Sequence, residues 1–592
     1  MMSYSTEKQD LPLAAQSFRE IRLNNYVYVD KTAFIYKLAR DRKPKFLCRP
    51  RRFGKSTVVS TLEELFLHGV QAYDGHESLF KGTALESLWT DEGSYHICHL
   101  RFSSITGSSR TADDFRGYFK RAIKKWGKKL GLEVFDETAT PEEIFEDFLD
   151  SLQDNSVVLL VDEYDMPLTK FLNANQTAEF DAVADQLRAF YTVVKEKSHK
   201  FRCVFITGIT RYKNAYLLTA GASVMDISQD REYGEICGYT RAEILKYFYP
   251  YLKEAARNLY GEDGHGAVSD TAVERLLDGM TQWYDGYCFD DRAATHVFST
   301  WSVLNFCAHV EDGFRPYWFD SAGVSTLIRK AFFRGDYENV LGMLDREDNS
   351  PEYGELSVGY QQFTNPSSLE RMNPVVLLFQ AGYLSISRPY VGQDATQGRV
   401  YLRLPNLEIQ SSFLDALSSM LVGDTAPGGI KAKTEQQFLE AVSRRDAVTL
   451  ITIFNRYIHV VDYEQDPIDK ESVFTMVLMF CVRDLLHLWP DINPHEAHGR
   501  PDLRFSSGDT TVIIENKFVP KHDVADYPRA CITKLEEGIS QILTRNYGAG
   551  ANSHQEPWRL ALVFSARERR IVCCADADSG ERYSLLSEGY GD

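Results

Sequence analysis

Along the first 220 residues, short apolar runs alternate with stretches in which apolar residues recur at helical spacing. This alternation predicts an α/β domain with a largely parallel sheet flanked by helices. The run at 156–161 (SVVLLV) is apolar throughout, which is typical of a strand buried on both faces. The elements predicted in this part are strands at 45–48, 96–102, 156–161 and 202–207, with a helix at 57–67 after the first strand.

The pattern changes twice beyond residue 235. From about 235 to 420 it is mostly helical, and residues 423–429 (GDTAPGG) indicate a linker because Gly and Pro interrupt both periodicities. A second α/β region follows, with predicted helices at 471–488 and 531–545 and predicted strands at 501–505, 511–516, 559–565 and 570–574. The predicted division is an α/β domain at 1–235, a helical middle region at 236–422 and a second α/β domain at 430–592.

Length and charge narrow the function classes. A chain of 592 residues holds several domains. A formal net charge of −18 excludes nucleic-acid binding over the whole surface, because polyphosphate would be repelled, and leaves only local contact. Residues 116–129 (RGYFKRAIKKWGKK) are the candidate basic patch, although the solvated face of an amphipathic helix explains them more simply.

Cysteine usage and hydropathy bear on location. The ten cysteines are scattered apart from the pair at 573–574, and no CxxC occurs, which predicts a reducing compartment and no zinc cluster. The N-terminus is polar, and the most apolar segment, 473–482, is far short of the roughly 20 residues that span a bilayer. We expect a cytoplasmic protein with no membrane partner, while export by a signal-less route stays open.

The first candidate site follows the first predicted strand. Residues 46–60 (FLCRPRRFGKSTVVS) place Gly54, Lys55 and Ser56 at the start of a helix, where backbone N–H groups face phosphates. Lys55 would reach the β- and γ-phosphates, and the Ser56 hydroxyl would bind Mg²⁺. Arg49 stands where the usual phosphate-binding loop begins with glycine, which weakens the match.

Two further strand ends supply the rest of a nucleotide site. Asp162 and Glu163 follow a buried strand, so Asp162 would hold Mg²⁺ through water and Glu163 would polarise the attacking water. Thr207 and Arg211 follow the next strand, where they would sense and neutralise the γ-phosphate. The simpler alternative to a nucleotide site is that Asp162 and Glu163 form an acidic turn after a core strand. Thr207 and Arg211 would then be ordinary polar residues after the next strand.

The second candidate site lies in the C-terminal region, in HGRPDLRF (498–505) and TTVIIENK (510–517). Glu515 and Lys517 are two apart on one predicted strand, so their side chains face the same way. Asp502, Glu515 and the Asn516 carbonyl would bind Mg²⁺ or Mn²⁺, and Lys517 would position or activate water. Two carboxylates that converge with one lysine predict a site for phosphodiester hydrolysis.

Two residues on neighbouring helices complete that prediction. Glu471 begins the preceding helix and would aim a third carboxylate at the metal, and Gln541 on the following helix would orient the site indirectly. A D…ExK pattern alone is loose. The helix–strand–strand–helix order around it strengthens the prediction.

Several segments together resemble a known family: RPRRFGKS (49–56), VDEYDMPL (161–168), FITGITRY (205–212), WYDGY (283–287) and LLFQAGYL (377–384) are similar to the predicted AAA-ATPase-like family. That family's loop typically reads RPRRFGKS, so the resemblance implies that Arg49 is the family's own form. Arg101 departs from it, since an aspartate is expected there. Residues 430–580 resemble the PD-(D/E)XK nuclease-like domain that commonly follows the same ATPase-like domain.

The resemblance implies a P-loop NTPase that uses ATP and Mg²⁺. The nucleotide-contacting residues it implies are Arg49, Arg52, Phe53, Gly54, Lys55, Ser56, Thr57, Asp162, Thr207 and Arg211. The leading hypothesis is an ATP-hydrolysing protein whose C-terminal domain is a metal-dependent nuclease that contacts nucleic acid locally. The rival is a nucleotide-dependent switch, in a secreted effector or defence factor, with a non-catalytic nuclease-like docking domain. Three questions stay open: whether the chain forms a homo-oligomer, whether the nucleic acid is DNA or RNA, and whether the nucleotide is ATP or GTP.

Overall fold

The chain divides into two compact units. The computed structural model describes residues 7–15, 17–131, 138–173, 176–211, 224–260, 269–318, 355–366, 372–391, 398–413, 428–459, 468–486, 490–492, 494, 499–522, 524, 526–548 and 556–586. Unit 1 comprises Met1–Ser321 and Ser357–Ile409, and unit 2 comprises Ala322–Leu356 and Gln410–Asp592. The three-part division at 1–235, 236–422 and 430–592 stays a prediction. Of the predicted linker, 423–427 lie outside the described residues, and Gly428 begins a helix.

Unit 1 contains the predicted parallel sheet. Its five strands run in the order β2-β3-β4-β1-β5, and every neighbouring pair is parallel. The strands are β1 (Lys45–Cys48), β2 (His96–Arg101), β3 (Val157–Asp162), β4 (Phe201–Gly208) and β5 (Met225–Asp226). The first four confirm the predicted strands. β3 and β4 are buried along their whole length, as their continuous apolar runs predict.

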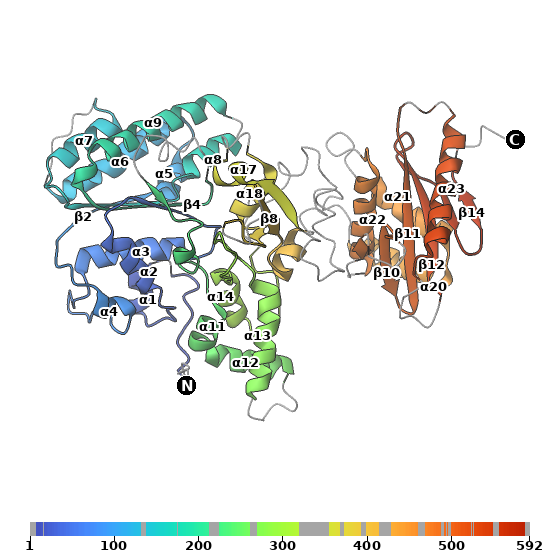
Figure 1. Cartoon of the computed structure of the whole chain (residues 1–592), viewed down its shortest axis with the longest axis horizontal. Helices are drawn as coiled ribbons and strands as arrows, with labels where there is room; N and C mark the ends of the chain where they lie inside the picture. Colours follow the sequence, from blue (N-terminus) through green and yellow to red (C-terminus); the bar gives the residue numbers. More distant parts are fainter. Residues whose placement is uncertain are drawn as a thin grey trace. The chain divides into compact units, whose positions relative to one another are not determined.

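Helices cover both faces of this sheet (Figure 1). On one side lie α1 (Phe18–Leu23), α2 (Thr32–Arg40), α3 (Lys55–His68) and α4 (Ala84–Leu88), and on the other α5 (Phe102–Ser108), α6 (Ala112–Lys129), α7 (Pro141–Asp150), α8 (Met166–Asn173) and α9 (Thr177–Glu196). Sequence signals set their ends: α6 and α7 each begin with a threonine capping box, and Pro141 occupies the first turn of α7. Short 3₁₀ turns occur at Ser198–Lys200 and Arg231–Tyr233.

The region after residue 235 is helical only in part. Its helices are α11 (Arg241–Tyr247), α12 (Tyr249–Tyr260), α13 (Asp270–Tyr284), α14 (Thr300–Ala308), α17 (Tyr360–Thr364) and α18 (Pro374–Ala381). A three-stranded sheet in the order β6-β8-β7 was not predicted; its strands are β6 (Leu356–Gly359), β7 (Ser385–Ile386) and β8 (Arg399–Arg403). Strands this short show too few alternations to be recognised. Helices α11–α14 share an apolar core that also takes in Val27 and Val29.

Unit 2 is built on a six-stranded sheet in the order β14-β13-β12-β11-β10-β9. Its strands are β9 (Asp491–Ile492), β10 (Leu503–Ser507), β11 (Thr510–Val519), β12 (Trp558–Ser565), β13 (Arg570–Asp576) and β14 (Arg582–Ser584), and its helices are α20 (Gly428–Arg444), α21 (Ala447–Ile458), α22 (Glu471–Leu486) and α23 (Tyr527–Arg545). β11 and β12 pair in parallel, and the other pairs are antiparallel. The predicted helix, two strands and helix are present as α22, β10, β11 and α23, and the short strand β9 between α22 and β10 was not predicted.

Helices α22 and α23 cover opposite faces of β11. Asn516 bonds to Thr475 of α22, whereas the alternate residues Glu515 and Lys517 lie against Gly538 of α23. All ten cysteines are buried free thiols. None of the described helices is long and apolar enough to cross a bilayer.

Candidate functional site

The loop from β1 to α3 lies where the sheet order reverses. β1 lies between β4 and β5. From β1 the chain continues to β2, at the sheet edge beyond β4, whereas from β4 it continues to β5, on the opposite side of β1. Ligands of open α/β sheets bind at the carboxyl ends of strands at such a point. Arg52 (φ 67°) and Gly54 (φ 89°) are both left-handed, so the loop turns sharply and delivers the start of α3 at Lys55. The phosphate-binding loop predicted from the sequence therefore has its expected context.

The Arg49 side chain has a structural role in this geometry, and its predicted nucleotide contact stays a prediction. Its side chain is 1 % exposed, and the guanidinium donates to the carbonyl oxygens of Cys48, Ser228 and Tyr233 at 2.5–3.0 Å. The cation also lies 4.4 Å from the centroid of the Phe289 ring. Arg49 is not among the residues with positive φ, so this backbone position has no need of glycine.

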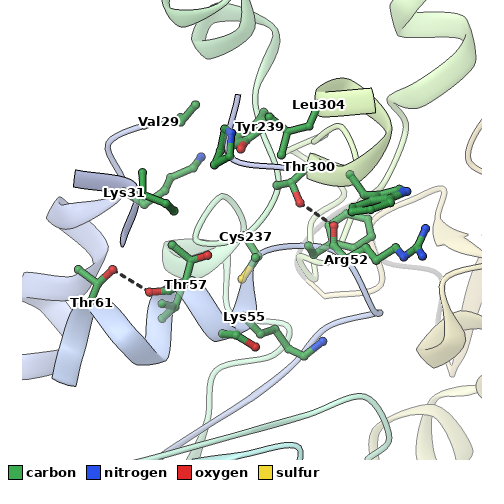
Figure 2. A pocket seen from close by; sticks show the side chains of 18 of the residues that line it. Val29, Lys31, Arg52, Lys55, Thr57, Thr61, Cys237, Tyr239, Thr300 and Leu304 are labelled. Atoms are coloured by element: carbon green, nitrogen blue, oxygen red, sulfur yellow. Dashed lines mark hydrogen bonds between the residues drawn. The ribbon is translucent and has the colours of Figure 1, made fainter. Parts of the chain in front are cut away.

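Three other predicted contacts are engaged with neighbouring groups, although Arg52 and Phe53 also line the cavity described below. Arg52 lies over the Trp301 ring at 4.1 Å, and its carbonyl accepts from the Thr300 hydroxyl at 2.6 Å (Figure 2). Phe53 packs edge-to-face on a buried tyrosine and phenylalanine, at 4.7 and 5.5 Å. Arg211 pairs with Asp226 at 2.6 Å, so in this geometry it anchors the β5 edge rather than neutralising a phosphate.

Lys55 and the hydroxyls around Asp162 form the polar end of the site. The Lys55 ammonium lies 2.9 and 2.8 Å from the carbonyl oxygens of Arg49 and Pro50, inside the loop. Asp162 is 6 % exposed, and each of its carboxylate oxygens accepts one hydroxyl: Ser56 donates at 2.8 Å and Thr207 at 2.6 Å. Ser56 lies in the first turn of α3 and Thr207 near the end of β4, so the carboxylate accepts hydrogen bonds from both flanking elements.

Glu163 and Asp165 take different roles at the end of β3. Glu163 is left-handed (φ 56°) and lines the cavity described below. Asp165 was missed by sequence reasoning. Its buried carboxylate accepts the N–H groups of Ile209 and Thr210 and the Thr210 hydroxyl, which ties the end of β3 to the end of β4. A second acid three residues after Asp162 was the available signal.

A cavity of about 620 Å³ extends from the loop (Figure 2). This volume lies within the range of small-molecule sites. One end is polar and is formed by 51–58 and Glu163. The other end is mostly apolar and comes from distant segments: Leu13, Val27, Val29, Tyr239, Trp301 and Leu304 line it. No local pattern links these residues to the loop, which explains why only the fold identified them. Thr57, whose contact with nucleotide stays a prediction, also lines the cavity.

Residues 12–217 match the family model described as "Predicted AAA-ATPase". The match includes the loop, Asp162 and Thr207, and it points to nucleotide binding and hydrolysis by this domain. The chain is also 26 % identical over 579 residues to a protein of Azotobacter chroococcum mcd 1 described as "Uncharacterized protein in vnfD 5'region". That alignment covers 95 % of this chain and 98 % of the relative.

Unit 2 brings Asp502, Glu515 and Lys517 near one another. The Lys517 ammonium lies 2.7 Å from one oxygen of Glu515, which is 1 % exposed. Asp502 accepts the Asn516 N–H at 2.6 Å, just before β10 begins. Burial, Glu515 and Glu471 raise the pKa of Asp502 to about 8. Burial also raises the pKa of Glu515, although Lys517 opposes the shift.

Gln541 and Gly538 belong to the wall that α23 forms over this cluster. A Cβ on Gly538 would lie 3.1 Å from that of Ala561 on β12, so glycine lets the helix approach the sheet closely. Gln541 donates to the Tyr547 hydroxyl at 3.2 Å, and that hydroxyl donates to the Arg500 carbonyl at 2.9 Å. Gln541 thus supports the chain leading to Asp502 rather than touching the carboxylates.

The metal prediction is only partly matched by this geometry. The second Glu515 oxygen is buried with no hydrogen-bond partner, and oxygen donors suit Mg²⁺. However, the described residues contain no group of three or more His, Cys, Asp or Glu side chains placed to hold a metal ion. Glu471 acts on the pKa of Asp502 through its charge, but the three carboxylates do not form one ready ligand set.

Proposed function

We propose that unit 1 binds and hydrolyses a nucleoside triphosphate, taken as ATP, with Mg²⁺. The observation that carries this proposal is the Asp162 carboxylate, which accepts hydrogen bonds from the Ser56 and Thr207 hydroxyls beside the Lys55 loop. A hydroxyl and a carboxylate 2.8 Å apart fit Mg²⁺, which prefers hard oxygen ligands. When bound, Mg²⁺ would neutralise charge on the phosphates.

The chain's own residues have distinct tasks in this proposal. Lys55 leaves its two carbonyl partners to contact phosphate oxygens, a stronger charge-assisted bond. Glu163, which lines the cavity just after β3, orients the attacking water. The apolar end of the cavity, at Val29, Tyr239 and Leu304, takes the nucleobase and removes its surface from water.

Two variants separate binding from hydrolysis. We expect Lys55→Ala to weaken nucleotide binding at least tenfold, because a buried charge-assisted contact of about 1.5–3 kcal/mol is lost. Glu163→Gln should retain binding but release phosphate about 100-fold more slowly, as expected for loss of a general base. Lys195→Ala, at an exposed position on α9, is the control. Binding is measured by calorimetry with ATP and turnover by phosphate release. Wild-type values for both variants would refute the assignment.

We propose as a second function that unit 2 is a metal-dependent nuclease acting on phosphodiester bonds. The supporting observation is the buried Glu515 oxygen without a partner, beside Asp502 and with Lys517 on the other oxygen. Asp502, Glu515 and the Asn516 carbonyl would hold Mg²⁺ or Mn²⁺, which would supply Lewis-acid activation of the phosphate. Lys517 would position water and offset the developing negative charge.

Cleavage of labelled DNA and RNA, with Mg²⁺, with Mn²⁺ and with EDTA, tests the nuclease proposal. We expect metal-dependent products from wild type and at least a 100-fold loss in Lys517→Ala, because it removes electrostatic stabilisation of the reaction. Asp509→Asn, in the exposed turn between β10 and β11, is the matched control. Nucleic-acid affinity without any product would instead favour the docking-domain alternative, in which unit 1 acts as a nucleotide-dependent switch.

A further inference from the structure

Unit 1 has a second cavity, of about 470 Å³, away from the phosphate loop. It is formed by α3, α6 and the edge strand β2, together with part of α5 and Phe148 of α7. In Figure 1, α3 and α6 lie on opposite sides of the sheet, with β2 at its border. The volume is again that of a small-molecule site. Neither the family match nor the proposed nucleotide site explains it.

The charges that line this cavity are mainly positive. Arg101, Lys125 and Lys129 line it, and among its described lining residues Glu63 is the one carboxylate. Glu63 is already engaged, because His99 lies 2.8 Å from it. Burial raises the pKa of Glu63, but the hydrogen bond and charge of His99, with the charges of Arg101 and Lys129, hold it below its ordinary value. The cavity therefore favours an anion.

Helix α6 extends this positive charge along the outside of the unit. Residues 116–129 carry seven Lys and Arg and no Asp or Glu, in a chain whose net charge is −18. The exposed cations are Arg116, Arg121, Lys125, Lys128 and Lys129. A solvated face would need no such imbalance of sign. The same lysines, Lys125 and Lys129, belong both to the outer face and to the cavity, so the two form one continuous surface, the α6 surface.

The chemistry inside the cavity complements these cations. Its remaining lining is largely apolar and includes Trp126, Leu100 and Phe148, each 7 % exposed or less, with His96 and His99 as polar members. Cations that follow a backbone beside an apolar, aromatic hollow are the arrangement by which proteins bind single-stranded nucleic acid. The bases of a duplex are paired and stacked inside the double helix, so a duplex would place no base in this cavity.

We propose that the α6 surface binds single-stranded nucleic acid, with phosphates on the α6 cations and one nucleotide in the cavity. This rests on the proposed action of unit 2 on nucleic acid. An anionic membrane fits less well. A membrane-binding amphipathic helix inserts its apolar face, whereas that face of α6, at Phe115, Phe119 and Ile123, is fully buried in unit 1.

The test is fluorescence anisotropy of the full chain with a labelled oligothymidylate of about 20 nucleotides. It is done in EDTA, so that cleavage plays no part, at salt from roughly 50 to 200 mM. The variant is Lys125→Ala/Lys128→Ala/Lys129→Ala, at exposed positions where alanine favours the helix. We expect its plot of log affinity against log salt to be shallower by about 2, since each single-strand phosphate contact contributes about 0.7.

The matched control is Arg42→Ala/Lys43→Ala/Lys195→Ala, which removes the same charge from exposed positions elsewhere in unit 1. Its slope should stay that of wild type. Equal slopes for wild type and the α6 variant, or equal losses in both triple variants, would overturn the proposal. So would α6-dependent binding to phosphatidylserine vesicles without binding to the oligonucleotide.

The same data separate this proposal from the nuclease. Binding that needs the α6 lysines, in a chain that makes no product with Mg²⁺ or Mn²⁺, would uphold the α6 surface and refute the nuclease. Cleavage of nucleic acid by a chain whose oligonucleotide affinity does not depend on these lysines would refute the α6 surface and uphold the nuclease.

Discussion

Replacing Asp502 by asparagine should stabilise unit 2 at alkaline pH while removing any nuclease activity. Asp502 is half-buried next to Glu515, and desolvation, Glu515 and Glu471 raise its pKa from 3.8 to about 8. A carboxyl group with a raised pKa in the folded state keeps its full stability contribution below about pH 4 and loses it as pH rises towards about 8. An amide does not titrate, so Asp502→Asn escapes this loss and still accepts the Asn516 N–H through its oxygen.

The magnitude follows from the pKa. Each pKa unit corresponds to about 1.4 kcal/mol, so ionisation of Asp502 across the three units from about pH 5 to about pH 8 costs wild type about 4 kcal/mol. The buried amide N–H₂ carries its own cost of about 1–3 kcal/mol, which is the same at every pH. The stability of Asp502→Asn relative to wild type should therefore improve by about 4 kcal/mol between these two pH values.

Urea unfolding of the full chain, followed by circular dichroism near pH 5 and near pH 8, measures this difference. Asp509→Asn is the control, because Asp509 lies in an exposed turn of the same unit. A relative stability of Asp502→Asn that does not change with pH, or that changes as much in the control, would refute the link between burial of the acidic cluster and its protonation.

Three further substitutions test the packing around the two sites. Gly538→Ala places a Cβ 3.1 Å from that of Ala561, so we expect a loss of about 1–2 kcal/mol in urea unfolding as α23 moves off the sheet. Arg49→Lys gives up the planar guanidinium that bonds three carbonyls and covers Phe289, and should cost about 2–4 kcal/mol in the same measurement. Burial raises the pKa of Glu408 to about 8, so Glu408→Gln should gain stability over wild type as the pH rises towards that value, as seen in thermal melts.

The first two substitutions have matched controls, and the third is judged by its pH dependence. Gly117→Ala, where a Cβ meets nothing within 4 Å on α6, should not destabilise, and equal losses at both glycines would contradict the close-approach argument. Arg42→Lys, at an exposed position, should be neutral, and a neutral Arg49→Lys would contradict its structural role. A pH-independent effect of Glu408→Gln would contradict protonation of that side chain in the fold.

The nucleotide site shows how far sequence reasoning reaches. The strand, loop and helix at 45–67 and the acids after Val161 were predictable, because backbone periodicity and a sharp glycine turn are local properties. The side-chain directions of Arg49 and Arg211 were not. Both were assigned to phosphate because of their position along the chain, yet both are paired with groups from 226–233 that only the folded chain brings near.

The sequence by itself determined the order of the strands and helices, the position of the loop at Gly54 and the alternation that points Glu515 and Lys517 the same way. These depend on neighbours one to four residues apart, where chain geometry alone decides. Only the tertiary structure decided which hydroxyls donate to Asp162 and which distant apolar residues line the cavity. It also decided that Lys125 and Arg101 belong to one surface. Those contacts join segments separated by tens to hundreds of residues, and they exist only once burial of the apolar faces has brought the segments together.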